Sequence, residues 1–259
     1  MTNLLRADKL KLLKSRKLWV VLGLFAFIPI FQVVNSWVET QHGVVLAPIK
    51  DLVINGASGV LGVAKNSEVV LFILAALVSF FINEEFQQGT IRNALSIGRS
   101  RSSFYFAKGV TLAVVTLVAC LLLTFFEIIC FTIFFGFGSM DGIDHYFLYA
   151  VNTFLTIYLL ILANIAVFVM ISFITKNIGV SLIWNWLYIL GIIFAPSLLQ
   201  RSAATQFLLD WITGTFLFYT SFTQPAEIAR FPWMILVSLL TIVVSSGIGI
   251  FFFKRSDIK

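Results

Sequence analysis

Six long apolar stretches alternate with polar segments along this chain. A helix needs about 20 predominantly apolar residues to cross the hydrocarbon core of a bilayer. The stretches that meet or approach this length are 18–38, 69–82, 110–137, 147–174, 178–199 and 232–253. The second is too short alone, so we expect it to extend outward past Lys65 and Glu68 or inward past Glu84. The pattern predicts an all-α membrane protein in which six transmembrane helices form one domain, 1–259.

Charge is distributed unevenly between the polar segments. If both termini are cytoplasmic, the inner segments carry 14 of the 18 Lys and Arg residues, and the outer segments carry only Lys50, Lys65, Arg201 and Arg230. Acidic residues lean the other way, since seven of the 12 lie outside. Lys and Arg are retained on the cytoplasmic side of inserted helices. The asymmetry therefore predicts a multi-pass protein of the inner membrane with both termini in the cytoplasm.

The basic residues begin in segment 1–17, where they alternate with leucines. We expect this segment to form a helix on the cytoplasmic membrane surface. The whole chain is 59% hydrophobic and only 12% charged, against about 25% charged residues in soluble domains. Its net charge of +6 lies at helix ends and not on one face of a folded domain. The positive charge therefore indicates how the helices are oriented in the membrane and that the helix ends contact a lipid surface. It argues against a nucleic-acid partner.

Two outer segments have unusual patterns. Segment 39–66 contains Gly56, Gly59 and Gly62 and is predicted to be an outer loop. The outer loop at 200–231 contains an apolar piece, 207–219, that is too short to cross a bilayer. We expect this piece to lie at the outer interface or to dip into the membrane and return.

Motifs for catalysis and for metal or nucleotide binding are missing. Segment 59–65 lacks the Gly-Lys pair of a phosphate-binding loop, and no nucleophile elbow or zinc-binding helix occurs. The two histidines, His42 and His145, are far apart in sequence and both predicted outside. We therefore expect no catalytic residues, no metal site and no directly bound cofactor.

Glu127 is an ionisable residue deep in an apolar stretch. A carboxylate at that depth is costly unless it faces a cavity or a partner, or takes a proton. Either Glu127 lies on a transport path, or it is a protonated or hydrogen-bonded structural residue. Asn152, Asn164 and Asn185 are predicted to form interhelical hydrogen bonds.

The most informative inner segment begins where the second span ends. It reads Asn-Glu-Glu-Phe-Gln-Gln-Gly-Thr-Ile-Arg-Asn-Ala-Leu-Ser over 83–96, followed by Arg99, Arg101 and Lys108. The pattern is that of a short amphipathic piece that docks a soluble partner, or of a solvated loop. Together with six spans, a basic N-terminal helix and an outer dip before the last span, it resembles the ABC type-2 exporter permeases.

This resemblance implies that 84–92 is a coupling helix that binds a separate ATPase subunit. The coupling positions it implies are Glu84, Glu85, Phe86, Gly89, Thr90, Ile91 and Arg92. It also implies a bacterial cell-membrane complex of two ATPase copies, which use ATP and Mg, with a second permease copy or a sibling permease. The compact size is similar to permeases that export bacteriocins, lantibiotics, bacitracin or other amphipathic peptides. The alternatives are a lipid-like or drug-like cargo, an ion-coupled secondary transporter that uses Glu127, and an intramembrane enzyme.

The charge asymmetry generates a topology prediction. Cysteines introduced as Ser96→Cys and Ser139→Cys should react from opposite sides of the membrane, because the two positions lie in an inner and an outer segment. An impermeant thiol reagent applied to intact cells should label only the Ser139→Cys variant. Equal external labelling of both variants would contradict the arrangement of six spans with both ends inside.

Overall fold

The computed structural model describes residues 2–42, 54–91, 100–140, 143–199, 203–218, 220–223 and 228–256. Within these ranges the chain is helical and contains no strand. The elements are α1 (Thr2–Lys14), α2 (Arg16–His42), η1 (Ala57–Leu61), α3 (Gly62–Lys65), α4 (Ser67–Gln87), α6 (Arg101–Phe135), α7 (Tyr146–Thr175), α8 (Ile178–Leu199), α9 (Ala203–Leu209), η2 (Thr213–Leu217), α10 (Thr220–Thr223) and α12 (Phe231–Arg255).

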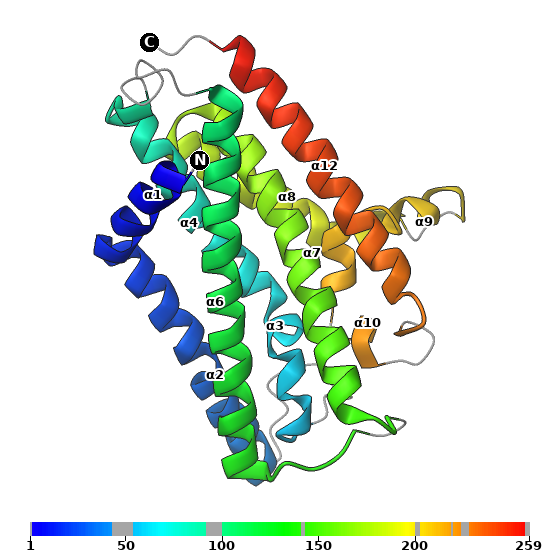
Figure 1. Cartoon of the computed structure of the whole chain (residues 1–259). Coiled ribbons are helices and arrows are strands. Elements are labelled where there is room, and N and C mark those ends of the chain that lie inside the picture. Colours follow the sequence, from blue (N-terminus) through cyan, green and yellow to red (C-terminus); the bar gives the residue numbers. More distant parts are fainter. Residues whose placement is uncertain are drawn as a thin grey trace.

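Six of these helices, α2, α4, α6, α7, α8 and α12, are long and apolar enough to cross a membrane, as predicted. Helix α1 and the end of α12 lie at the same end of the bundle (Figure 1). We call this the predicted cytoplasmic end. Helix α6 is 35 residues long, or about 52 Å at 1.5 Å per residue. It therefore exceeds the hydrocarbon thickness of about 30 Å, and it runs unbroken from one end of the bundle to the other.

Local sequence explains where several helices begin and end. The Ser100 side chain caps α6 by accepting a hydrogen bond from the backbone nitrogen of Ser103 at 3.2 Å. Lys176 ends α7 with a φ of 53°, and Asn177 then caps α8 by accepting from the nitrogen of Val180. Pro232 lies in the first turn of α12, where its missing N–H breaks no helical hydrogen bond.

The prediction of an outer loop over 39–66 is wrong at both of its ends. Helix α2 continues to His42, and η1 and α3 form buried helical turns just before α4. A side chain in place of Gly59 would come within 2.7 Å of the Ile128 backbone in α6, and one in place of Gly62 would come within 2.8 Å of Leu123. These glycines therefore allow close packing of η1 and α3 against α6. They are not signs of a flexible loop.

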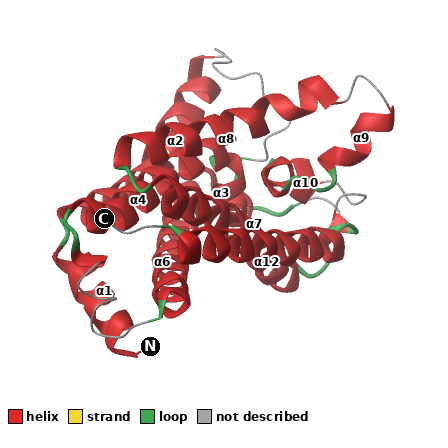
Figure 2. Ribbon diagram, turned by 90° about the horizontal axis from the view of Figure 1, so that it is seen from above, coloured by secondary structure: helices red, strands yellow, loops and turns green. Residues whose placement is uncertain are grey.

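Polar side chains join α4, α7 and α8 inside the bundle. Ser181 of α8 lies 2.7 Å from Ser172 of α7 and donates to Ser79 of α4 at 3.1 Å. Asn185 also donates to Ser79, at 2.9 Å. Seen from above, α7 lies between α4, α6 and α12 (Figure 2). Hydrogen bonds and small side chains hold helices together in lipid, because burying apolar surface gives no driving force there.

The three asparagines expected to join helices behave differently. Asn185 joins α8 to α4 as predicted, and Asn164 of α7 accepts a hydrogen bond from Tyr188 of α8 at 3.2 Å. Asn152 is exposed on α7, and no interhelical hydrogen bond from its side chain occurs within the described ranges. Its predicted role as a link between helices stays a prediction.

The segment between the last two spans is partly buried. Thr213, Gly214, Phe216 and Leu217 of η2 are buried, and η2 packs against α7, α8 and α12. The turn after α9 is tied to α12, since Asp210 pairs with Arg230 and its carbonyl accepts from the Trp233 indole at 3.0 Å. The predicted apolar piece 207–219 thus bends back into the bundle and does not form another span.

Candidate functional site

The predicted coupling segment is the end of α4 and the turn that follows it. Helix α4 passes the predicted end of the second span and continues to Gln87. Gly89 then adopts a φ of +67°, a conformation that favours glycine, and its nitrogen donates to the carbonyl of Phe86 at 3.2 Å. Thr90 donates back to the carbonyl of Glu85 at 3.3 Å. Arg92, the last predicted coupling residue, lies outside the described residues.

Four charged side chains meet beside this segment, and we call them the Lys108 cluster: Asp8, Lys11, Glu85 and Lys108. The Lys108 ammonium donates to Asp8 Oδ1 at 2.5 Å and to Glu85 Oε1 at 2.7 Å. Lys11 also donates to Glu85 Oε1, at 2.9 Å. Lys108 is only 2% exposed and lies over the Phe81 ring at 4.5 Å. The cluster joins α1, α4 and α6 at the predicted cytoplasmic end.

The structure pairs both glutamates of the predicted coupling set within the chain itself. Glu85 is buried in the Lys108 cluster, and Glu84 accepts a hydrogen bond from Lys17 of α2 at 2.8 Å. The side chains that reach solvent here are Gln87, Gln88 and Thr90. We call residues 87–90 the tip. The surface of the tip is polar and uncharged. Because the Glu85 side chain is buried, basic residues of a partner that binds the tip need not contact it.

Aromatic packing holds the other side of the segment. The Phe86 ring contacts Phe173 of α7 and Phe253 of α12 edge-on, with centroids 5.8 and 6.2 Å apart. Ile91 is 1% exposed. Arg101, at the start of α6, donates to the backbone carbonyls of Phe253, Lys254 and Ser256 at 2.8–2.9 Å. The end of α4 is therefore fixed to α6, α7 and α12 as well as to α1.

Sequence reasoning missed Asp8, Lys11 and Lys17 as partners of the coupling segment. Asp8 and Lys108 are 100 residues apart, and Lys11 and Glu85 are 74 apart. No local spacing indicates such pairs. The available signal was the lone Asp8 in a basic surface helix, because an acidic residue there needs a cationic partner if it is buried.

Glu127 lies in a second buried ionic group, the Lys65–Glu127 cluster, formed by Gln32, Ser58, Lys65, Asn66 and Glu127. The Lys65 ammonium is 3.5 Å from Glu127 Oε1 and donates to Ser58 Oγ at 2.9 Å. Gln32, with its amide nitrogen turned toward the carboxylate, donates to Glu127 Oε1 at 3.0 Å. Both charged side chains are essentially inaccessible, at 1% and 0% exposure. The cluster links α2, η1, α3 and α6, while the role of Glu127 in a transport path stays a prediction.

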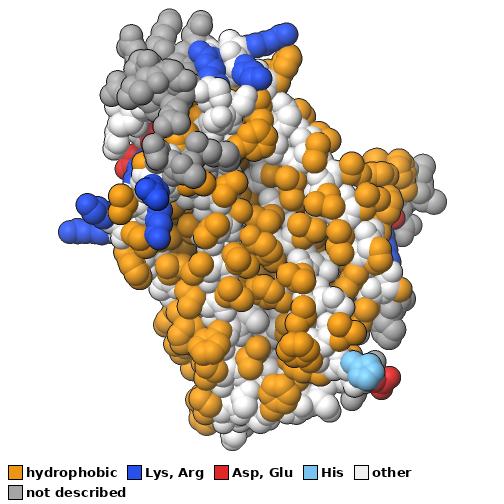
Figure 3. Space-filling model, viewed as in Figure 1, with side chains coloured by type: hydrophobic (Ala, Val, Ile, Leu, Met, Phe, Trp, Pro, Cys, Tyr) orange, Lys and Arg blue, Asp and Glu red, His pale blue; other side chains and the backbone are white. Residues whose placement is uncertain are grey.

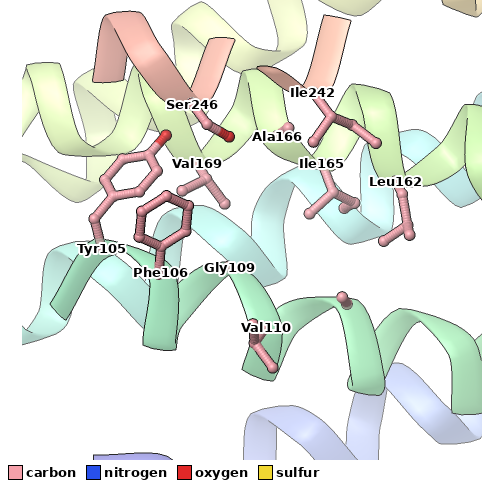
Figure 4. Close-up of a pocket in the computed structure, with 11 residues that line it drawn as sticks. Tyr105, Phe106, Gly109, Val110, Leu162, Ile165, Ala166, Val169, Ile242 and Ser246 are labelled. Atoms are coloured by element: carbon pink, nitrogen blue, oxygen red, sulfur yellow. The ribbon is translucent and has the colours of Figure 1, made fainter. Parts of the chain in front are cut away.

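A cavity of about 210 Å³ lies between α6, α7 and α12 (Figure 4). Its lining is almost entirely apolar and includes Phe106, Leu162 and Ile242. Tyr105 lines the end of the cavity nearest the Lys108 cluster, and its buried hydroxyl has no hydrogen-bond partner among the described residues. The apolar lining suits an apolar group.

Burial controls the ionisation of Asp8. Removal from water raises the pKa of the Asp8 carboxyl, and this effect exceeds the lowering by the Lys108 charge and hydrogen bond. Because the pKa is higher in the folded state, Asp8 lowers the free energy of unfolding at any pH above its pKa in the unfolded chain. That cost disappears as the pH falls. Lys108 still has Glu85 as a partner when Asp8 is neutral.

These two observations predict losses of stability of different size for two substitutions in the Lys108 cluster. Lys108→Met leaves the buried Glu85 and Asp8 carboxylates together without Lys108, and this should cost about 3–5 kcal/mol of stability. Asp8→Asn should cost under about 1 kcal/mol at pH 7, since it removes a carboxylate that burial already disfavours. Thermal unfolding in detergent measures both effects. Equal losses in the two variants would contradict the central position of Lys108.

Comparison with known proteins adds an independent result. The family model of the ABC-2 family transporter protein matches residues 4–193, which is more than half of the chain and includes both ionic clusters. No curated protein sequence matches the chain. The six membrane-spanning helices agree with the family match. The chain belongs to the ABC-2 transporter family and is a transporter membrane subunit.

Proposed function

We propose that this chain is the transmembrane subunit of a bacterial ABC exporter in the cell membrane. Two copies of a separate ATPase subunit would bind ATP and Mg and hydrolyse ATP, and a second permease copy or a sibling permease would complete the path. The permease itself is not an enzyme in this proposal and holds no cofactor. The observation that carries the proposal is the tip, a polar turn held on a rigid base at the predicted cytoplasmic end.

Coupling would follow from how the tip is attached. The Lys108 cluster and the Phe86 contacts connect the tip to α1, α6, α7 and α12. A push from a closing ATPase dimer would therefore move these helices as one body. Packed interfaces of this kind change by rigid-body rotation and not by continuous bending.

The cargo that we propose is an amphipathic peptide such as a bacteriocin or another antimicrobial peptide or toxin. The cavity between α6, α7 and α12 supports an apolar cargo group, since Phe106, Leu162 and Ile242 line it (Figure 4). A lipid-like or drug-like cargo is the second candidate. The same apolar lining suits a hydrocarbon chain of a lipid-like or drug-like molecule.

Substitutions at the tip test the coupling role. Gln88→Trp and Gly89→Trp should abolish ATP hydrolysis that depends on the complex, because each places a bulky ring on the surface that would enter the ATPase cleft. No atom lies within 4 Å of a side chain added at Gly89, but its φ of +67° strains any other residue. Gln88→Trp, which carries no such strain, is therefore the decisive variant. Hydrolysis is measured with the complete complex in reconstituted membranes.

Lys254→Trp is the matched control, because it adds the same ring to an exposed position at the same end, outside the tip. This variant should keep wild-type hydrolysis. The coupling assignment would be lost if both tip variants hydrolysed ATP normally, since changes in a solvated loop cost under about 0.5 kcal/mol.

A secondary transporter that uses Glu127 as a proton relay is the alternative function. The observation in its favour is a fully buried carboxylate within a membrane span. However, Lys65 lies 3.5 Å from that carboxylate, so a structural ion pair accounts for the same burial. Secondary transporters also commonly contain internal repeats, and the sequence shows none.

A double substitution separates these two roles of Glu127. Glu127→Leu alone leaves Lys65 buried without its carboxylate and should cost about 3–5 kcal/mol, whereas Lys65→Met with Glu127→Leu should be nearly as stable as the wild type. Thermal unfolding of the three proteins tests the ion pair. If the double variant is stable but no longer exports an amphipathic peptide, the relay role gains support. If the double variant still exports the peptide with ATP, the Lys65–Glu127 ion pair has a structural role only.

A further inference from the structure

A second groove, of about 470 Å³, lies on the opposite side of α6, where α1 and the start of α2 face it. Its walls include Leu5 and Leu12 of α1, Leu18 and Leu22 of α2, and Val114 and Val118 of α6. Lys9 of α1 is its charged lining residue. The groove is thus an apolar slot with a cationic group at its rim.

The depth of the groove matches one leaflet of a bilayer. Along α6 it extends from Val110 to Val118, which is about 12 Å at 1.5 Å per residue. Half of the hydrocarbon thickness is about 15 Å. The groove begins directly after Lys108, at the level of the charged residues that mark the predicted cytoplasmic end.

The rim of the groove carries excess positive charge. Arg6, Lys9 and Lys14 are exposed on α1, and none of them pairs with a carboxylate among the described residues. Lys11 and Lys17 are already paired with Glu85 and Glu84. Asp8 is the acidic residue of α1, and it is buried against Lys108. Figure 3 shows Lys and Arg side chains gathered at the level of α1, above a surface that is largely hydrophobic.

We propose that this groove binds one anionic phospholipid from the cytoplasmic leaflet. An acyl chain would lie in the slot between α1, α2 and α6, and the phosphate would contact Lys9 with Arg6 or Lys14. Unpaired basic residues beside an apolar slot at leaflet depth match the two parts of such a lipid. The proposal depends on neither the cargo nor the ATPase.

The position of the groove gives the lipid a physical effect. Lys9 follows Asp8 in the chain, and Leu12 is buried where α1 meets the bundle. A lipid chain between α1 and α6 adds packing to the contact that the Lys108 cluster already holds. Bound lipid should therefore stabilise the base of the tip.

Native mass spectrometry of the purified full chain tests the proposal. The protein is mixed with phosphatidylglycerol or phosphatidylcholine that have identical acyl chains. We expect one phosphatidylglycerol per chain, retained at least about tenfold more strongly than phosphatidylcholine. Lys9→Gln should weaken phosphatidylglycerol retention about fivefold, since one basic residue near anionic lipid contributes about a factor of this size.

Val114→Trp should abolish retention by filling the slot, and Val118→Phe serves the same purpose if the first variant does not fold. Val243→Trp on the exposed face of α12 and Lys254→Gln are the matched controls and should bind like the wild type. Equal retention of the two lipids would overturn the headgroup contact. Full retention by the groove variants, or loss in the controls, would overturn the location.

Discussion

The Lys108 ammonium is buried where three helices meet, and this constraint organises the predicted cytoplasmic end of the molecule. A buried cation is stable only when carboxylates and hydrogen bonds replace the water it has lost. Asp8 of α1 and Glu85 of α4 supply them. Helix α1, the end of α4 and α6 must therefore keep one mutual arrangement, and the tip depends on that arrangement for its position.

Helix α6 carries both of the buried ionic clusters. Lys108 lies near its start, and Glu127 lies near its other end, opposite Lys65 of α3. Beside the Lys65–Glu127 cluster, Gly59 and Gly62 allow η1 and α3 to pack closely against α6. These contacts make α6 the element against which α1, α2, η1 and α3 are positioned. In the proposed exporter, a force applied at the tip would be transmitted to α6 through the Glu85–Lys108 pair.

Apolar run length predicted the six spans well, because a bilayer imposes both length and composition on each helix. The predicted range 178–199 coincides with α8. The loop predicted around Gly59 was wrong because glycine indicates either a turn or close packing, and only the distant α6 decides between them. Likewise, no spacing rule connects Asp8 with Lys108 or Lys65 with Glu127. The coupling role of 84–92 came from the family resemblance, and it stays a prediction.

Through the Lys108 cluster, α1 and the tip should move as one rigid body. Spin labels at Leu10→Cys and Gln88→Cys, in a variant with Cys120 and Cys130 replaced by alanine, measure it directly, since both labelled positions are exposed. Double electron–electron resonance on this protein in lipid nanodiscs should give one narrow distance distribution. A broad distribution, or two populations, would show that α1 moves independently of the tip and would contradict the account.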